Sequence, residues 1–267
     1  MIKSIQKLLA ISAAAGAFFL SSCGGGGNPS DVLVIGMELN YPPFEMKDKT
    51  GVPEGVSIDM AEKLGEHLGM EVEIRDMAWV GLIPALQSGR IDCVISSMTI
   101  TDERDEQIDF SEPYVKTGIC LLVQKDGDIK SFEDLKSPNR RISCKLGTTG
   151  HTFAQENLPD AELAVLEDAA LCALEVSQGR SDAFIYDQIS IAQFAMDQYP
   201  DTTVALLEPV RTEVWGVGLA EGDEELREGI NAFITKFRED GGFDELGDKW
   251  LGDSKATFEE LGVEFVF

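Results

Sequence analysis

The chain has 267 residues, of which 43% are hydrophobic, and a formal net charge of −26 at pH 7. So acidic a chain excludes nucleic acids and anionic lipid headgroups as partners, because phosphate neutralisation requires a basic patch. With two histidines and no Cys-x-x-Cys spacing, the sequence gives little support to a zinc site, and no cofactor is expected.

The N-terminus has the pattern of an export signal. Lys3 and Lys7 precede an apolar run over residues 8–20, which is shorter than the roughly 20 residues that a spanning helix needs. The run ends in Leu-Ser-Ser-Cys at Cys23, which resembles the lipobox of bacterial lipoproteins. This resemblance implies a signal peptide over residues 1–22, lipidation of the Cys23 thiol, and a flexible tether over residues 23–30. The alternative is an ordinary signal peptide with an incidental cysteine.

From residue 32 onward, strand-like and helix-like segments alternate. Apolar residues recur at helical spacing from Ile58 to Leu68, and the segment ends at Gly69. In chain order, the sequence predicts strands over 32–36, 71–74 and 91–95, with helices over 58–68 and 82–86 between them. The order β-α-β-α-β implies a parallel sheet with helices on its faces.

A second set of elements follows residue 118. The predicted strands are 118–123, 182–185 and 214–219, and the predicted helices are 152–157, 169–178, 224–239 and 243–250. The fold class is therefore α/β.

Beyond Cys23 the chain carries four more cysteines, three of them in apolar, strand-like runs: Cys93, Cys120, Cys144 and Cys172. Export permits disulfides. The sequence is compatible with two alternatives: four buried free thiols, or one disulfide between two of these cysteines.

Five stretches carry a resemblance to a known family. They are Tyr41-Pro42-Pro43-Phe44, the segment 81–92, Met98-Thr99-Ile100-Thr101-Asp102-Glu103-Arg104 with Asp109-Phe110-Ser111 after it, Gly147-Thr148-Thr149, and Tyr186-Asp187. In their order and spacing they resemble bacterial extracellular solute-binding protein family 3, the polar amino-acid-binding proteins of ABC importers.

This resemblance implies the type 2 periplasmic-binding-protein fold, with two Rossmann-like lobes and a two-segment hinge. Lobe one would comprise residues 31–114 and 215–267, and lobe two residues 118–211. The hinge would lie near Tyr114–Gly118 and Arg211–Trp215, and the tail over residues 254–267 lies beyond the resemblance.

The resemblance also implies a set of ligand-binding residues, and their chemistry fits a free amino acid. Arg104 offers a planar fork of donors for a carboxylate, and Asp187 can accept from an ammonium. The alternatives are a surface salt bridge of Arg104 with Asp102 or Glu106, and an N-cap role for Asp187. The other candidates are Ser97, Met98, Thr99, Lys145, Thr149 at a helix start, Glu38, and the aromatic residues Tyr41 and Trp79, for which core packing is the alternative.

Two positions bear on the ligand side chain. Glu38 favours a side chain that donates, as in glutamine, arginine, lysine or histidine. Ser57 stands where relatives that hold cations often carry Asp, which weakens the case for a strongly cationic ligand. By resemblance, the chain is expected to be an extracytoplasmic, lipid-anchored monomer that delivers its amino acid to an ABC permease and ATPase.

Two other classes of function stay open. One is an enzyme like the cyclohexadienyl (arogenate) dehydratases found on this scaffold, in which Glu38 or Glu213 would serve as the acid. The other is an amino-acid sensor module, although no second membrane-spanning run is expected.

Overall fold

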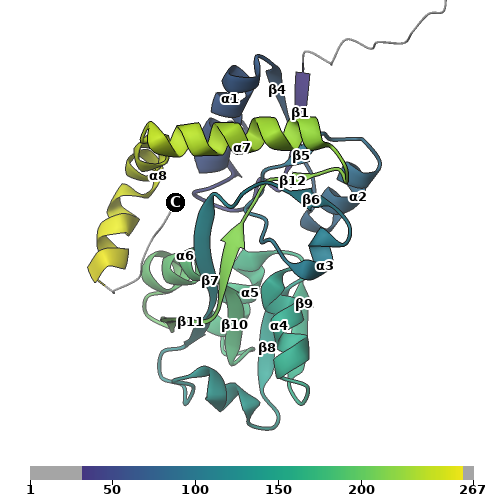
Figure 1. The fold of residues 1–267 in the computed structure, drawn as a ribbon. Helices are drawn as coiled ribbons and strands as arrows, with labels where there is room; N and C mark the ends of the chain where they lie inside the picture. Colours follow the sequence, from purple (N-terminus) through teal and green to yellow (C-terminus); the bar gives the residue numbers. More distant parts are fainter. Residues whose placement is uncertain (1–31, 261–267) are drawn as a thin grey trace, which may run out of the picture. The chain divides into compact units, whose positions relative to one another are not determined.

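The computed structural model describes residues 32–260, and the side chains of residues 32–252. The expected signal peptide, Cys23 and the tether lie outside the described residues, as do the side chains of the tail. Two five-stranded sheets organise the described part (Figure 1). No helix in that part is long and apolar enough to cross a bilayer.

The first sheet has the strand order β4-β1-β5-β12-β6. β1 pairs in parallel with β4 and β5, as predicted, whereas β12 is antiparallel to β5 and β6. The predicted strand 91–95 shortens to two residues, because only these pair with β1. The strands are β1 (Val32–Met37), β4 (Glu71–Asp76), β5 (Cys93–Val94), β6 (Asp109–Phe110) and β12 (Gly218–Leu219).

Helices cover both faces of this sheet. One layer packs the apolar side of α1 against α7 and α8, and the other is formed by α2 with the short helical turn η1 before it. The C-cap Gly69 has a φ of 70° and ends α1 where the sequence predicted. The bounds are α1 (Val56–Leu68), η1 (Trp79–Gly81), α2 (Leu82–Gln87), α7 (Glu224–Glu239) and α8 (Gly242–Glu260).

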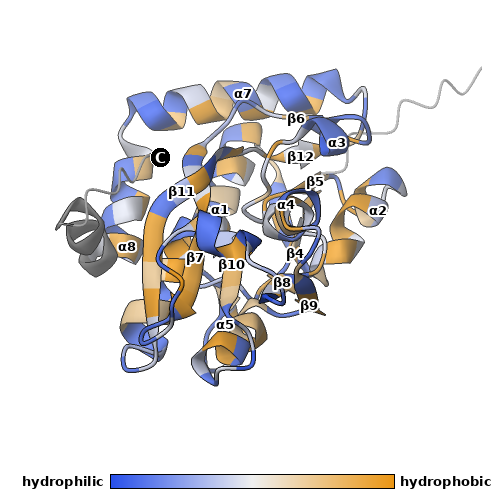
Figure 2. Cartoon of the chain, turned by 90° about the horizontal axis from the view of Figure 1, so that it is seen from below, coloured by the Kyte–Doolittle hydropathy of each residue, from blue (hydrophilic) through white to orange (hydrophobic). Residues whose placement is uncertain are grey.

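The second sheet has the order β11-β7-β10-β8-β9. Figure 2 shows β7 and β10 as largely apolar strands, whereas β11 alternates between apolar and hydrophilic stretches. Ile119, Leu121 and Val123 of β7 face one core with α4, and Cys120 and Leu122 face the other with α5. The elements are β7 (Val115–Gln124), β8 (Arg141–Lys145), α4 (Thr149–Asn157), β9 (Glu162–Leu166), α5 (Ala169–Ser177), β10 (Ala183–Asp187) and β11 (Thr203–Trp215).

The chain passes between the sheets at two places that lie side by side. It leaves the first sheet after β6 and returns to it between β11 and β12, and Trp215 pairs with Val115 across the two crossings. The single predicted strand 214–219 is therefore wrong, because its halves belong to different sheets. A Cβ on Gly216 would lie 2.8 Å from the end of the Ile100 side chain, so any larger residue here requires that side chain to shift.

Several short elements were not predicted, because their periodicity extends over too few residues. They are the hairpin β2 (Met46–Lys47) and β3 (Pro53–Glu54), α3 (Asp102–Asp105), η2 (Phe132–Lys136), α6 (Gln188–Gln193) and the π-helical turn η3 (Phe194–Gln198).

Candidate ligand-binding site

One cavity collects most of the predicted site residues. It lies beyond the carboxyl ends of β1, β5, β8 and β10, where ligands of open α/β sheets gather. Eight of the ten predicted residues line it: Glu38, Tyr41, Trp79, Ser97, Thr99, Arg104, Thr149 and Asp187. Six further residues complete the lining, namely Glu45, Ser96, Thr148, Tyr186, Glu213 and Trp215.

Arg104 is buried in this cavity and is not a surface residue. It lies in α3, whose N-cap Thr101 accepts from the Arg104 N–H. Its guanidinium donates to the carbonyls of Thr99 (2.7 Å) and Gly147 (3.2 Å), rather than to Asp102 or Glu106. Burial lowers the pKa of Arg104 to about 10, which leaves it charged at neutral pH. Its fork is thus held by backbone carbonyls that a ligand carboxylate could replace.

Asp187 both caps a helix and lines the cavity. Its Oδ1 accepts from the Ser190 N–H over 3.0 Å, as the N-cap alternative requires. Its Oδ2 is buried and makes no hydrogen bond of normal geometry among the described residues, although the Tyr41 hydroxyl is near enough to lower the pKa of this carboxyl. Burial raises the pKa of Asp187, because the charged form loses water. A buried carboxylate oxygen without a donor is unfavourable unless a ligand supplies one.

A carboxylate that the sequence did not single out for binding joins two threonines. Glu213, on β11, accepts from the hydroxyls of Thr99 and Thr149, both over 2.9 Å, and pairs with Arg211. Each hydroxyl has one proton, so both threonines have only acceptor capacity left for a ligand. The N-cap of α4 is Thr148, so Thr149 opens the helix with its backbone N–H without an intrahelical partner.

Lys145 lies outside the cavity lining but pairs with a residue of that lining. Its ammonium donates to Glu38 Oε2, and the two side chains are 2% and 14% exposed. The other oxygen, Glu38 Oε1, accepts only a long hydrogen bond of 3.4 Å, from the backbone N–H of Trp79. The pair joins the end of β1 to the end of β8, which belong to different sheets.

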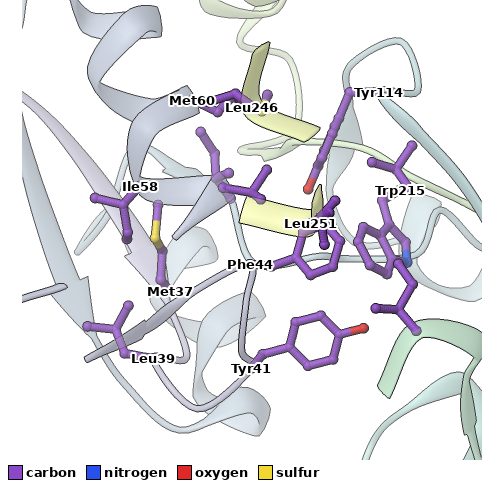
Figure 3. Packing of buried hydrophobic residues seen from close by; sticks show 14 of the residues in the cluster. Met37, Leu39, Tyr41, Phe44, Ile58, Met60, Tyr114, Trp215, Leu246 and Leu251 are labelled. Atoms are coloured by element: carbon purple, nitrogen blue, oxygen red, sulfur yellow. The ribbon is translucent and has the colours of Figure 1, made fainter. Parts of the chain in front are cut away.

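The aromatic residues contribute in two ways. Tyr41 packs edge-on against Trp215, which also contacts Phe44, and Figure 3 shows the three rings together. Trp79 is partly buried, stacks under the Arg104 guanidinium at 5.2 Å from the ring centre, and donates from Nε1 to the Gly147 carbonyl over 2.9 Å. Core packing and cavity lining therefore both hold for these residues.

Glu45 is the most buried carboxylate of the lining, with 1% exposure. It accepts from the hydroxyls of Ser57 (2.6 Å), Ser97 (3.1 Å) and Ser96 (3.3 Å). Burial raises its pKa to about 8 against the opposing effect of these bonds, so it is mostly protonated at pH 7. The hydroxyl of Ser57 is thus a hydrogen-bond donor to Glu45. No sequence pattern indicated that Ser57, Ser96 and Ser97 would meet at this carboxyl.

Met98 does not line this cavity. Its side chain is 1% exposed and packs with Leu82, Val94 and Ile108, while its carbonyl accepts from the Gly216 N–H over 3.0 Å. Its predicted contact with ligand gains no support from this placement.

Among the described residues, the cysteines form no disulfide and the possible metal ligands form no cluster. The four described cysteines are all buried and free: Cys93, Cys120, Cys144 and Cys172. Within residues 32–252, no group of three or more His, Cys, Asp or Glu side chains could hold a metal ion.

Comparison with known proteins identifies the class. Residues 33–253 match the sequence model of the bacterial extracellular solute-binding proteins, family 3. The chain belongs to this family.

Relatives within the family bind different amino acids. The L-cystine-binding protein TcyJ of Escherichia coli (strain K12) is 32% identical over 222 residues, which is 82% of each chain. The crystal structure of the ancestral amino acid-binding protein AncCDT-1, a precursor of cyclohexadienyl dehydratase, is 40% identical with a TM-score of 0.76, over 82% of this chain and 95% of that one. An ancestral arginine-binding protein bound to glutamine is 34% identical with a TM-score of 0.78, over 84% and 100% of the two chains. The predicted fold class is confirmed.

Proposed function

We propose that this protein captures a free polar α-amino acid in the cavity between its two sheets and delivers it to an ABC transporter. The observation that carries the proposal is the presence in one cavity of Arg104, whose guanidinium donates to two backbone carbonyls, and of Asp187, whose buried Oδ2 makes no hydrogen bond of normal geometry among the described residues. A carboxylate and an ammonium on the same carbon satisfy both.

Each contact follows from the hydrogen-bond capacities in the cavity. The ligand carboxylate would take the Arg104 fork and the backbone N–H of Thr149 at the start of α4. The ligand ammonium would donate to Asp187 Oδ2 and to the hydroxyl oxygens of Thr99 and Thr149. These two hydroxyls donate their own protons to Glu213 and so can only accept from the ligand.

Closure follows from the same contacts. We assign residues 31–114 and 215–267 to one lobe and 118–211 to the other, with the hinge in the paired crossings. Arg104 and Asp187 belong to different lobes, so the zwitterion bridges them and shifts the population towards the closed state.

The surroundings complete the proposal. The signal pattern and Cys23 support an extracytoplasmic location, in which the lipid alone would hold the protein to the membrane. The closed monomer would then dock on a permease with its ATPase.

The dehydratase alternative loses support from the geometry. Its candidate acids, Glu38 and Glu213, are already engaged within the protein, in ion pairs with Lys145 and Arg211. We therefore propose that the protein is not an enzyme. Incubation with arogenate and with prephenate tests this, and formation of an aromatic product would revive the alternative.

The binding proposal is tested by a thermal-shift screen of the chain from Asn28 onward against all free α-amino acids. One or two of them should raise the melting temperature in a concentration-dependent way. Arg104→Ala should abolish the shift, and Arg75→Ala, which removes an exposed arginine paired with Glu73, should keep it. If no α-amino acid binds protein freed of co-purified ligand, the proposal is wrong.

A further inference from the structure

The carbonyl of Gly147 accepts hydrogen bonds from two side chains at once. The indole N–H of Trp79 donates to it over 2.9 Å, and Nη2 of Arg104 donates to it over 3.2 Å. Trp79 lies in η1 and Arg104 in α3, which follow strands β4 and β5 of the first sheet, whereas Gly147 follows β8 of the second. The centre of the same indole ring lies 5.2 Å from the guanidinium. Trp79 therefore contacts Arg104 in two ways, by its ring and through a shared acceptor.

Gly147 presents its carbonyl to these donors from a left-handed turn. Its φ is 73°, and a Cβ there would lie 3.3 Å from the Val80 side chain and 3.4 Å from the Trp79 ring. The turn leads directly into α4, whose first residue, Thr149, has a backbone N–H without an intrahelical partner. The bond from Trp79 therefore holds the turn that carries a second donor for a carboxylate.

The hydrogen-bond capacities show which of these donors a ligand can use. A guanidinium has five N–H donors, and Arg104 uses two of them on the carbonyls of Thr99 and Gly147, which leaves three for a carboxylate. Because Arg104 is only 9% exposed, the two carbonyls set the direction of the remaining donors. The indole of Trp79 has a single donor, which is already used on Gly147. The Trp79 N–H thus acts on a ligand through other groups, not by direct contact.

We propose that Trp79 is a positioning residue for the α-carboxylate of the ligand: through the Gly147 carbonyl it directs the Arg104 fork and the Thr149 backbone N–H onto one carboxylate group. This inference rests on the proposed function. Without the indole N–H, the turn and the guanidinium would have more freedom before binding, and ordering them would cost affinity. A ring that only packed against the ligand side chain would instead act equally on ligands with and without a charged carboxylate.

The test is isothermal titration calorimetry of the full-length chain in detergent at pH 7, with glutamine, arginine, lysine and histidine and with the α-amide of each. Trp79→Phe keeps a ring beside Arg104 and removes the N–H, so it should weaken binding of the free amino acids about three- to tenfold. The α-amides should change by less than about twofold, because a neutral amide gains far less from a guanidinium fork. Trp250→Phe, which removes an indole bond to Asp59 Oδ2 between α8 and α1, should leave both affinities unchanged.

A second substitution separates the N–H from the size of the ring. The residue β-(3-benzothienyl)alanine at position 79 keeps a bicyclic ring and lacks only the donor, so it should reproduce the selective loss. Any other α-amino acid that the thermal-shift screen detects is paired with its α-amide in the same way, and thermal shifts at high concentration measure amides that bind too weakly for calorimetry.

The outcomes distinguish this inference from the proposed function on which it rests. Equal losses for the free amino acids and their α-amides, or unchanged binding in the benzothienyl protein, would overturn the positioning role of Trp79 and uphold the proposed function. Wild-type protein that binds no α-amino acid would overturn both.

Discussion

The hydroxyl of Thr99 donates to Glu213 over 2.9 Å, although the two residues are 114 positions apart in the chain. Thr99 follows β5 of the first sheet, and Glu213 lies on β11, which pairs in the second sheet. The bond orients the one hydroxyl proton of Thr99 away from the ligand. Glu213 therefore sets which end of a zwitterion this wall of the cavity receives.

Replacing Glu213 by glutamine should weaken amino-acid binding about tenfold, which corresponds to about 1.4 kcal/mol. The neutral amide is a weaker acceptor than a carboxylate and can also donate, so the threonine hydroxyls are no longer held as acceptors. Titration calorimetry measures the change. Glu208→Gln, an exposed position on the same strand, is the matched control. Tighter binding would instead mean that Glu213 competes with the ligand for the hydroxyls.

The raised pKa of Glu45 predicts a pH-dependent stability. The folded protein holds this proton up to a pKa of about 8, whereas the unfolded chain releases it near 4.5. The contribution of protonated Glu45 to the unfolding free energy is complete below pH 4.5. It is lost as the pH rises to about 8, and the unfolding free energy falls by no more than ~1.4 kcal/mol per pH unit.

Denaturant unfolding of wild type and Glu45→Gln across pH 5–8 checks this. The difference in unfolding free energy between the two should change with pH in favour of the glutamine variant as the pH rises. Glu54→Gln, a change in the nearby β2–β3 hairpin, should show no such trend. Parallel pH profiles of Glu45→Gln and wild type would show that Glu45 is ionised throughout.

Sequence patterns predicted the long elements and the two groups that a zwitterion needs. The helix spacing of residues 224–239 extends over four turns, so its prediction matches α7. Arg104 and Asp187 were predicted from the family resemblance of the motifs that contain them, and both residues line the same cavity. The role of Glu45 was not predicted, because its three serine partners are 12, 51 and 52 residues away in the sequence. The pairing of Glu38 with Lys145 likewise depends on how two different sheets face each other.

Gly150 lies where α4 meets β10, the two elements that position Thr149 and Asp187. A Cβ at Gly150 would lie 2.3 Å from the Ile185 carbonyl oxygen, so a methyl group must push the helix from the strand. Gly150→Ala should lower the unfolding free energy by about 1–3 kcal/mol and weaken amino-acid binding. Gly81→Ala, whose methyl would meet nothing within 4 Å, is the control for chemical denaturation and titration. Equal stability of the two variants would contradict this packing.

The state of the cysteines decides between the two alternatives that the sequence left open. All four described cysteines are buried and free, and burial raises the pKa of the Cys120 and Cys144 thiols to about 12. Since the thiolate is the reactive form, native protein should not react with a thiol reagent at pH 8. A chain that begins at Asn28 should expose four reactive thiols when unfolded without reductant. Only two reactive thiols in denaturant, rising to four after reduction, would demonstrate a disulfide and contradict the structure.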